Sequence, residues 1–192
     1  LGLLTFSMQK EGKRFQIQVL DVGQGDGIYI ESDAGTEIFV DGGSVDVSEV
    51  GKYRIQPFLK SHGVKEVDYW FVSHCDADHC NGLMELLEAD VPIKHLVFSK
   101  YVLRDEAQEE LVALAKRKGC QVLYLEEGEC FRDASVRIQA MYPSEKSVEG
   151  ERNADSLVLL LEHEAFRGLL TGDIGQELSL IHISEPTRHA QI

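Results

Sequence analysis

Four side chains of the kinds that bind metal ions lie close together in the segment 74–79, whose sequence is HCDADH. The segment follows an apolar stretch and precedes a helical pattern, and α/β proteins commonly build binding sites at such strand ends. A loop there can divide its ligands between two adjacent ions, with His74 and Asp76 on one and Asp78 and His79 on the other. The spacing therefore predicts a binuclear metal site.

Two other interpretations of this segment stay open at the level of sequence. One is an acidic surface loop that carries two solvated histidines. The other is a zinc site using the thiolates of Cys75 and Cys80, which the lack of a Cys-x-x-Cys spacing disfavours. Because Cys120 and Cys130 add no such spacing either, we expect reduced thiols rather than a disulfide framework.

Two further aspartates, like the cluster at 74–79, directly follow apolar stretches of the sequence. Asp41 ends the apolar stretch EIFV and is followed by two glycines, and Asp173 ends the segment 171–173 (TGD) after another apolar stretch. Glycine lets the backbone approach an ion closely, although an Asp-Gly pair alone is common turn chemistry. Together with the cluster, the two aspartates form a constellation of candidate metal-site residues.

The segment 22–27 (VGQGDG) has alternating glycines that suggest a phosphate-binding loop. It lacks the Gly-Lys-Ser/Thr ending of such loops and does not open a helix, which disfavours nucleotide binding. We predict instead a tight hairpin that presents Asp26 near the metal site.

The composition indicates one globular domain. The chain has 192 residues, of which 43% are hydrophobic and 27% charged, and no apolar run long enough to span a membrane. The first residue is Leu, so we expect the chain to begin inside a longer reading frame whose membrane segments, if present, lie upstream. A net charge of −14 excludes a broad basic surface, so metal ions would have to supply positive charge for a phosphodiester substrate.

The elements that must position these residues follow from hydrophobic periodicity and turn signals. The pattern predicts three short strands at the start, then strands and amphipathic helices in alternation, then three more strands. This order indicates an α/β sandwich with helices covering sheet faces. The predicted strands are 15–20, 27–31, 36–41, 67–73, 95–98, 121–125, 136–141, 156–162 and 166–171, and the predicted helices are 54–62, 81–89 and 105–118.

The constellation resembles a known family. The pattern His-x-Asp-x-Asp-His at 74–79, with Asp-Gly-Gly at 41–43 and Thr-Gly-Asp at 171–173, resembles the metallo-β-lactamase superfamily. The segments 20–27 (LDVGQGDG) and 153–157 (NADSL), with Asp76 where most members carry His, are similar to the soluble C-terminal domain of ComEC-type competence proteins. The resemblance runs from about 15 to 173. It implies a metallo-β-lactamase-like αββα sandwich, incomplete at the C-terminus.

The resemblance also implies roles for individual residues. His74 and Asp76 would bind the first ion, Asp78 and His79 the second, Asp173 would bridge both, and Asp78 would also be catalytic. Behind these ligands, Asp41 would orient one of them, and Asn153 stands near a place where the wider superfamily has a further His. Such oxygen-rich ligation favours two Mn²⁺ ions, with Zn²⁺ as the alternative.

The implied function is a metal-dependent hydrolase, a nuclease acting on DNA during uptake for transformation, in which two ions activate a water for attack on the phosphodiester. DNA would be the partner of a parent protein in the bacterial cell membrane, and this fragment would be soluble. The alternatives are an esterase, thioesterase or lactamase of the same fold, or a non-catalytic interaction domain.

The end of the chain is expected to be foreign to the domain. The segment 178–188 (LSLIHISEPTR) resembles the translation of a transposase adapter used in sequencing libraries, although a genuine apolar strand is the alternative. We therefore expect a metallo-β-lactamase-like domain over 1–177 and a non-native tail over 178–192. Because the family's last His ligand and closing elements would be missing, the chain as given is predicted to be unstable or inactive.

Overall fold

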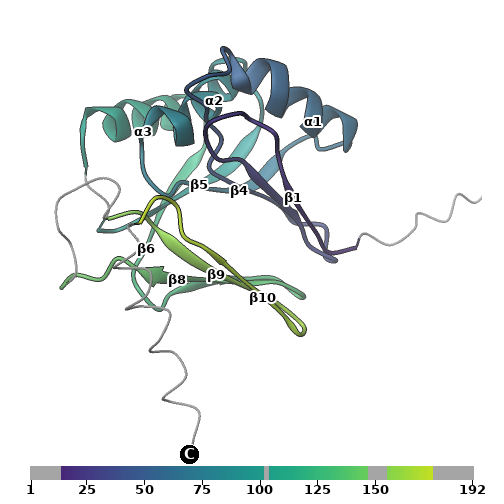
Figure 1. The fold of residues 1–192 in the computed structure, drawn as a ribbon, viewed down its shortest axis with the longest axis vertical. Helices are drawn as coiled ribbons and strands as arrows, with labels where there is room; N and C mark the ends of the chain where they lie inside the picture. The colour runs from purple at the N-terminus through teal and green to yellow at the C-terminus, as the bar shows by residue number, and fades with distance from the viewer. Residues whose placement is uncertain (1–13, 102–103, 147–154, 175–192) are drawn as a thin grey trace, which may run out of the picture.

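The computed structural model describes residues 14–101, 104–146 and 155–174 (Figure 1). Asn153 and the predicted tail at 178–192 lie outside the described residues. The described chain forms two sheets and a layer of helices, and the predicted α/β sandwich is confirmed.

The larger sheet has six strands in sequential order. Pairing is antiparallel among its first three strands and parallel from the third strand onward, where helices connect successive strands. Parallel strands carry their carboxyl ends to one edge, so the loops after them meet there. The strands are β1 (Gln16–Val19), β2 (Ile28–Glu31), β3 (Glu37–Val40), β4 (Val67–Phe71), β5 (Ile93–Ser99) and β6 (Gln121–Leu125).

The smaller sheet is antiparallel, in the order β10-β9-β8-β7. Its strands are β7 (Cys130–Arg132), β8 (Arg137–Tyr142), β9 (Val158–His163) and β10 (Phe166–Leu170). The sequence pattern did not predict β7, because this strand has three residues and leaves Cys130 and Arg132 exposed. Asp173 follows the last strand, at the edge of this sheet.

Four helical segments are described: a π-helical turn η1 (Gly51–Ile55), α1 (Gln56–Ser61), α2 (Ala77–Glu88) and α3 (Glu106–Arg117). The predicted helix at 54–62 is therefore a π turn followed by a short α-helix. The second predicted helix begins at Ala77 rather than at 81, because Asp76 in extended conformation serves as its N-cap residue. Asp105 caps α3, its side chain accepting a hydrogen bond from the backbone N–H of Gln108 at 2.9 Å.

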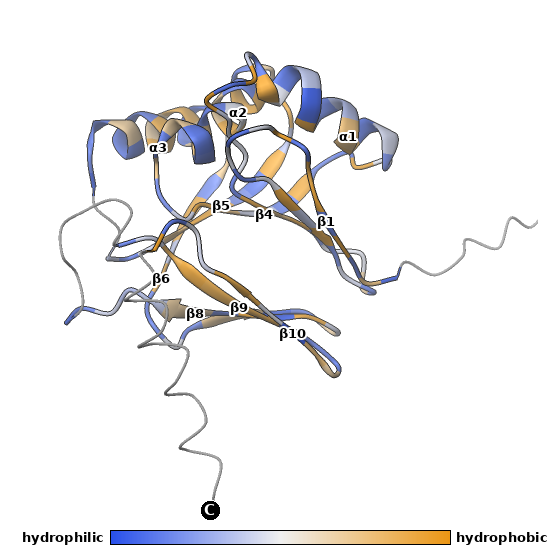
Figure 2. Ribbon diagram, viewed as in Figure 1, coloured by the Kyte–Doolittle hydropathy of each residue, from blue (hydrophilic) through white to orange (hydrophobic). Residues whose placement is uncertain are grey.

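Two hydrophobic clusters hold the layers together. One lies between the helices and the larger sheet and includes Trp70, Leu83 and Leu111. The other lies between the two sheets and includes Phe71, Ile138 and Leu159. Figure 1 shows the helices on one side of the larger sheet and the smaller sheet on the other, and Figure 2 shows helices with both hydrophilic and hydrophobic residues and a largely hydrophobic β9.

Of the αββα layers predicted, the described residues form the first helical layer and both sheets. They contain no helix on the outer face of the smaller sheet. None of the described helices is both long and apolar enough to cross a membrane.

The first prediction concerns Gly82, where a Cβ atom would meet the carbonyl oxygen of Gly42 at 2.6 Å and Cδ1 of Ile55 at 3.0 Å. We expect Gly82→Ala to lower the free energy of unfolding by about 1 to 3 kcal/mol through overpacking. This loss would outweigh the gain of about 1 kcal/mol in helix propensity. Urea unfolding followed by circular dichroism measures it.

The matched control is Glu88→Ala at the exposed end of the same helix, where we expect a change within about 0.5 kcal/mol. An increase in stability for Gly82→Ala would show that α2 does not pack against the loop at Gly42 as closely as described.

Candidate metal centre

Asp41 lies where the centre begins, just after β3. Its backbone N–H donates to the carbonyl of Phe71 at 2.9 Å, which continues the parallel pairing of β3 and β4 by one step. Asp41 then turns the chain with φ of 56°, a left-handed conformation that aspartate adopts more readily than most residues. The turn brings its buried carboxylate to Ser73 after β4 and to His79 in the first turn of α2.

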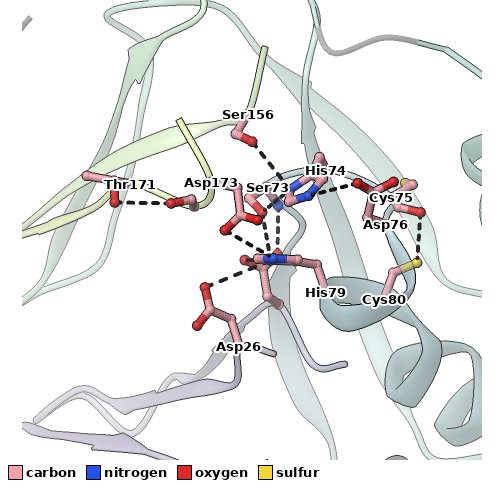
Figure 3. A network of polar contacts seen from close by, with 12 residues as sticks. Asp26, Ser73, His74, Cys75, Asp76, His79, Cys80, Ser156, Thr171 and Asp173 are labelled. Atoms are coloured by element: carbon pink, nitrogen blue, oxygen red, sulfur yellow. Dashed lines mark hydrogen bonds and ion pairs between the residues drawn. The ribbon is translucent and has the colours of Figure 1, made fainter. Parts of the chain in front are cut away.

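The Asp41 carboxylate joins two elements. Its Oδ1 accepts a hydrogen bond from the backbone N–H of Ser73 at 2.8 Å, and its Oδ2 lies 3.1 Å from Nδ1 of His79. A carboxylate only accepts, so Nδ1 of His79 carries a proton and Nε2 is the nitrogen left to bind a metal. That Nε2 atom lies 3.4 Å from Oδ1 of Asp173, which reaches the centre from the end of β10 (Figure 3).

His74 is oriented differently, by two hydroxyl groups. Its Nδ1 lies 3.0 Å from Oγ of Ser73 and 3.3 Å from Oγ of Ser156, which comes from the segment before β9. Its Nε2 is buried and has no hydrogen-bond partner in the described part of the chain. An unpartnered buried nitrogen costs free energy, so this atom needs a ligand that the protein itself does not provide.

The donor atoms of His74, His79 and Asp173 all lie within 4.8 Å of one another. Two imidazole nitrogens and a carboxylate are a donor set that divalent transition metals accept. A cation bound here would also provide a ligand for the buried Nε2 atom of His74, which has no hydrogen-bond partner in the described part of the chain. The described residues therefore fit a metal centre at this position.

The two imidazoles have opposite electrostatic environments. Burial, and then the nearby charge of His79, hold the pKa of His74 below its usual value. Burial also disfavours the charged form of His79, but the hydrogen bond and charge of Asp41 and the charge of Asp173 outweigh it and raise its pKa to about 9. The acidic groups thus stabilise a positive charge on His79 in the absence of a metal ion.

Asp76 and Asp78 are placed differently with respect to this group. Oδ2 of Asp76 lies 3.6 Å from Nε2 of His74, beside the candidate ligands. Asp78 is half-buried in the first turn of α2, and its side chain is in neither group of candidate ligands among the described residues. The two imidazole rings are tilted by 45° with 4.1 Å between their centroids, whereas the sequence prediction divided them between two ions. The assignment of these residues to separate ions stays a prediction.

Asp26 does reach the centre, as the hairpin prediction required. Its backbone N–H donates to the carbonyl of Asp78 at 3.1 Å, and its Oδ2 lies 3.9 Å from Nδ1 of His79. Burial, followed by the charge of Asp41, raises the pKa of Asp26. Asp26, Asp41 and His79 form a second group of candidate ligand atoms within 4.8 Å.

The orienting hydroxyls of Ser73 and Ser156 were missed by the sequence analysis. A serine beside a candidate ligand gives no local signal, and Ser156 is 82 positions from His74 in the chain. Cys75 and Cys80 are buried free thiols, and the Cys80 thiol donates to the carbonyl of Cys75 at 3.4 Å. Neither cysteine belongs to a group of candidate metal ligands among the described residues.

Comparison with curated proteins gives a relative of this chain, although no family model matches it. ComE operon protein 3 of Bacillus subtilis (strain 168) is 25% identical over 175 residues. The match covers 84% of this chain and 22% of the relative, so the chain corresponds to a small part of that protein.

Solved structures give the fold. The metallo-β-lactamase fold protein YhfI from Bacillus subtilis superposes with a TM-score of 0.54 at 13% identity, covering 81% of this chain and 62% of YhfI. Zn²⁺-bound PqqB from Methylobacterium extorquens superposes with a TM-score of 0.51 at 11% identity, covering 75% of this chain and 47% of PqqB. The chain therefore has the metallo-β-lactamase fold, and most of its length is similar to a part of ComE operon protein 3.

Proposed function

We propose that this chain is a metal-dependent hydrolase domain, and that its parent protein is a nuclease acting on DNA during uptake for transformation. One observation carries the proposal: the buried, unpartnered Nε2 atom of His74 faces the same small space as Nε2 of His79 and a carboxylate oxygen of Asp173. DNA as the substrate and a bacterial membrane as the location of the whole protein are what the resemblance to ComEC-type competence proteins implies, and the similarity to ComE operon protein 3 agrees with that resemblance.

In this proposal His74, His79 and Asp173 hold metal, with Asp76 beside them and Asp78 supplying a further carboxylate from the first turn of α2. Two divalent ions would supply positive charge and Lewis acidity for hydrolysis of a phosphodiester. Because carboxylates outnumber imidazoles among these residues, we propose Mn²⁺ as the preferred ion.

The surrounding residues orient both imidazoles so that the Nε2 atom of each can bind a metal ion. Asp41 holds a proton of His79 on Nδ1, so Nε2 is the nitrogen that binds metal once its own proton is displaced. For His74 the same tautomer requires Nδ1 to donate to the hydroxyl of Ser73 or Ser156. A ligand imidazole whose other nitrogen donates in this way is held in one orientation, and partners of this kind commonly change metal affinity by 10- to 100-fold, roughly, when mutated.

The second prediction concerns activity and the choice of metal. We expect the protein, completed from its natural gene, to cleave DNA with Mn²⁺ and much less well with Zn²⁺. Asp173→Ala and Asp78→Ala should each reduce the cleavage rate by at least about 100-fold, because a lost ligand removes transition-state charge stabilisation. A gel assay of DNA cleavage under metal titration measures both.

Glu110→Ala, an exposed carboxylate on α3, is the matched control and should cleave at the wild-type rate. Cleavage by Asp78→Ala at the wild-type rate would point to a contaminating nuclease or to another site. Hydrolysis of thioesters or lactams with no cleavage of DNA would replace the nuclease proposal.

The third prediction tests Asp41 as the group that orients His79. Asp41→Asn keeps the size of the side chain but removes its charge, so we expect affinity for Mn²⁺ to fall by about 10- to 100-fold. Calorimetric titration of the metal-free protein gives the affinity without any need for activity. Asp90→Asn, at an exposed position after α2 where the carboxylate pairs with Lys118, should leave the affinity unchanged. An unaltered affinity in Asp41→Asn would remove Asp41 from the proposal.

The fourth prediction uses the raised pKa of His79. At pH 7.5 this imidazole, with a pKa of about 9, is mostly protonated without metal, so metal binding must displace its proton. We therefore expect release of about one proton per bound cluster at pH 7.5, falling toward zero as the pH rises above the pKa of the group. Calorimetry in buffers of different ionisation enthalpy counts these protons. Proton release that does not change between pH 7.5 and 10 would contradict the assignment of His79 as a ligand.

A further inference from the structure

The segment 51–65 is basic, although the chain as a whole is acidic. It contains Lys52, Arg54, Lys60 and Lys65 and no Asp or Glu, although the whole chain carries a formal charge of −14. Lys52 is neutralised by Glu49 at 2.7 Å. In the described part of the chain, Arg54, Lys60 and Lys65 make no ion pair, so their charge is available to a partner.

Arg54 lies over a groove between the end of β1 and the helical segment η1–α1. The groove has a volume of about 330 Å³ and is lined by Gln18, Val19, Leu20, Asp21, Arg54 and Phe58. Strand β1 is the edge of the larger sheet, and Figure 1 shows α1 beside it. The groove is therefore bordered on one side by a strand whose outer edge pairs with no other described strand.

The walls of the groove combine a cation with apolar surface. The Val19 side chain is 76% exposed, and Phe58 is half-buried between Tyr29 and His62, with ring centroids at 5.1 and 4.1 Å. Such packing holds the Phe58 ring in place. Cations that bind phosphates, together with apolar or aromatic side chains that contact unstacked bases, are what proteins use to bind single-stranded nucleic acid.

The groove and the metal centre share one loop. This loop begins at Leu20 and Asp21 in the groove, is closed by a hydrogen bond of 2.8 Å from the N–H of Leu20 to the carbonyl of Gly27, and places Asp26 at His79. This loop therefore connects the groove to the candidate metal centre.

We propose that the groove between β1 and η1–α1 binds a single strand of nucleic acid, with Arg54 on its phosphates and Phe58 and Val19 against its bases. This inference rests on the proposed function, since it names where the substrate strand lies. Single-stranded rather than duplex DNA is the partner because Phe58 and Val19 can contact bases only where the bases are unpaired. Asp21 opposes the phosphates at the end of the groove, and its charge keeps the strand on the Arg54 side.

The test is binding of a fluorescently labelled oligothymidine to the full chain, measured by anisotropy at several salt concentrations. We expect Arg54→Glu to weaken binding by about tenfold and to reduce the salt slope by about 1, because one phosphate is no longer neutralised. Asp21→Asn should strengthen binding, by about twofold, because it removes a repelling charge. A variant with a folding defect would not bind more tightly, so Asp21→Asn guards against that explanation.

The matched control is Arg117→Glu, which makes the same change of charge at an exposed position on α3 and should leave binding near the wild-type value. Equal weakening by Arg54→Glu and Arg117→Glu, or tighter binding of duplex than of single strand, would overturn the groove proposal.

Hydrolysis of bis(p-nitrophenyl) phosphate with Mn²⁺ separates this proposal from the proposed function. This small ester does not span the groove, so Arg54→Glu should hydrolyse it at the wild-type rate. A completed wild-type protein that hydrolyses neither the ester nor DNA would refute the nuclease proposal, and the anisotropy data would still decide the groove.

Discussion

The geometry of the centre depends on the buried carboxylate of Asp41, which joins a strand end to a helix. One oxygen holds the N–H of Ser73 after β4, and the other holds the imidazole of His79 in α2. Few side chains can do both, because the group must be short, accept two hydrogen bonds and tolerate a left-handed backbone. Removal of either hydrogen bond would leave a buried polar group without its partner, which is costly in the core.

Close packing of backbone around this carboxylate explains why the surrounding residues are small. A Cβ atom on Gly43 would lie 2.4 Å from the carbonyl oxygen of Ala77, and one on Gly51 would lie 2.4 Å from that of Gly82. The loop after β3 therefore touches the first turn of α2, and η1 touches its middle. This packing fixes the helix, and so His79, relative to the sheet edge from which Asp41 projects.

Charge is distributed unevenly over the molecule, with acidic groups at the candidate metal centre and basic groups in the segment 51–65. At the centre, Asp26, Asp41 and Asp173 surround two imidazoles, an arrangement that raises the pKa of His79 and is suited to holding cations. The segment 51–65 carries the opposite charge, at the other end of the loop that presents Asp26. The chain as a whole carries a formal charge of −14, so its average electrostatic effect on a phosphate is repulsive.

Hydrophobic periodicity alone determined most of the fold: it predicted β6 at the residues observed and α3 to within a residue at each end. Residue types at strand ends made His74, His79, Asp41 and Asp173 candidates, because a strand end followed by glycine or a helix is a local pattern, and their role as metal-site residues stays a prediction. The missed features depend on tertiary structure. The short strand β7 is stabilised by pairing with β8, and the start of α2 at Ala77 is set by the loop packed against it. Only the folded chain brings Ser156 to His74 or the loop of Asp26 to Arg54, because hydrogen bonds and grooves form between groups whose distance in space no local pattern encodes.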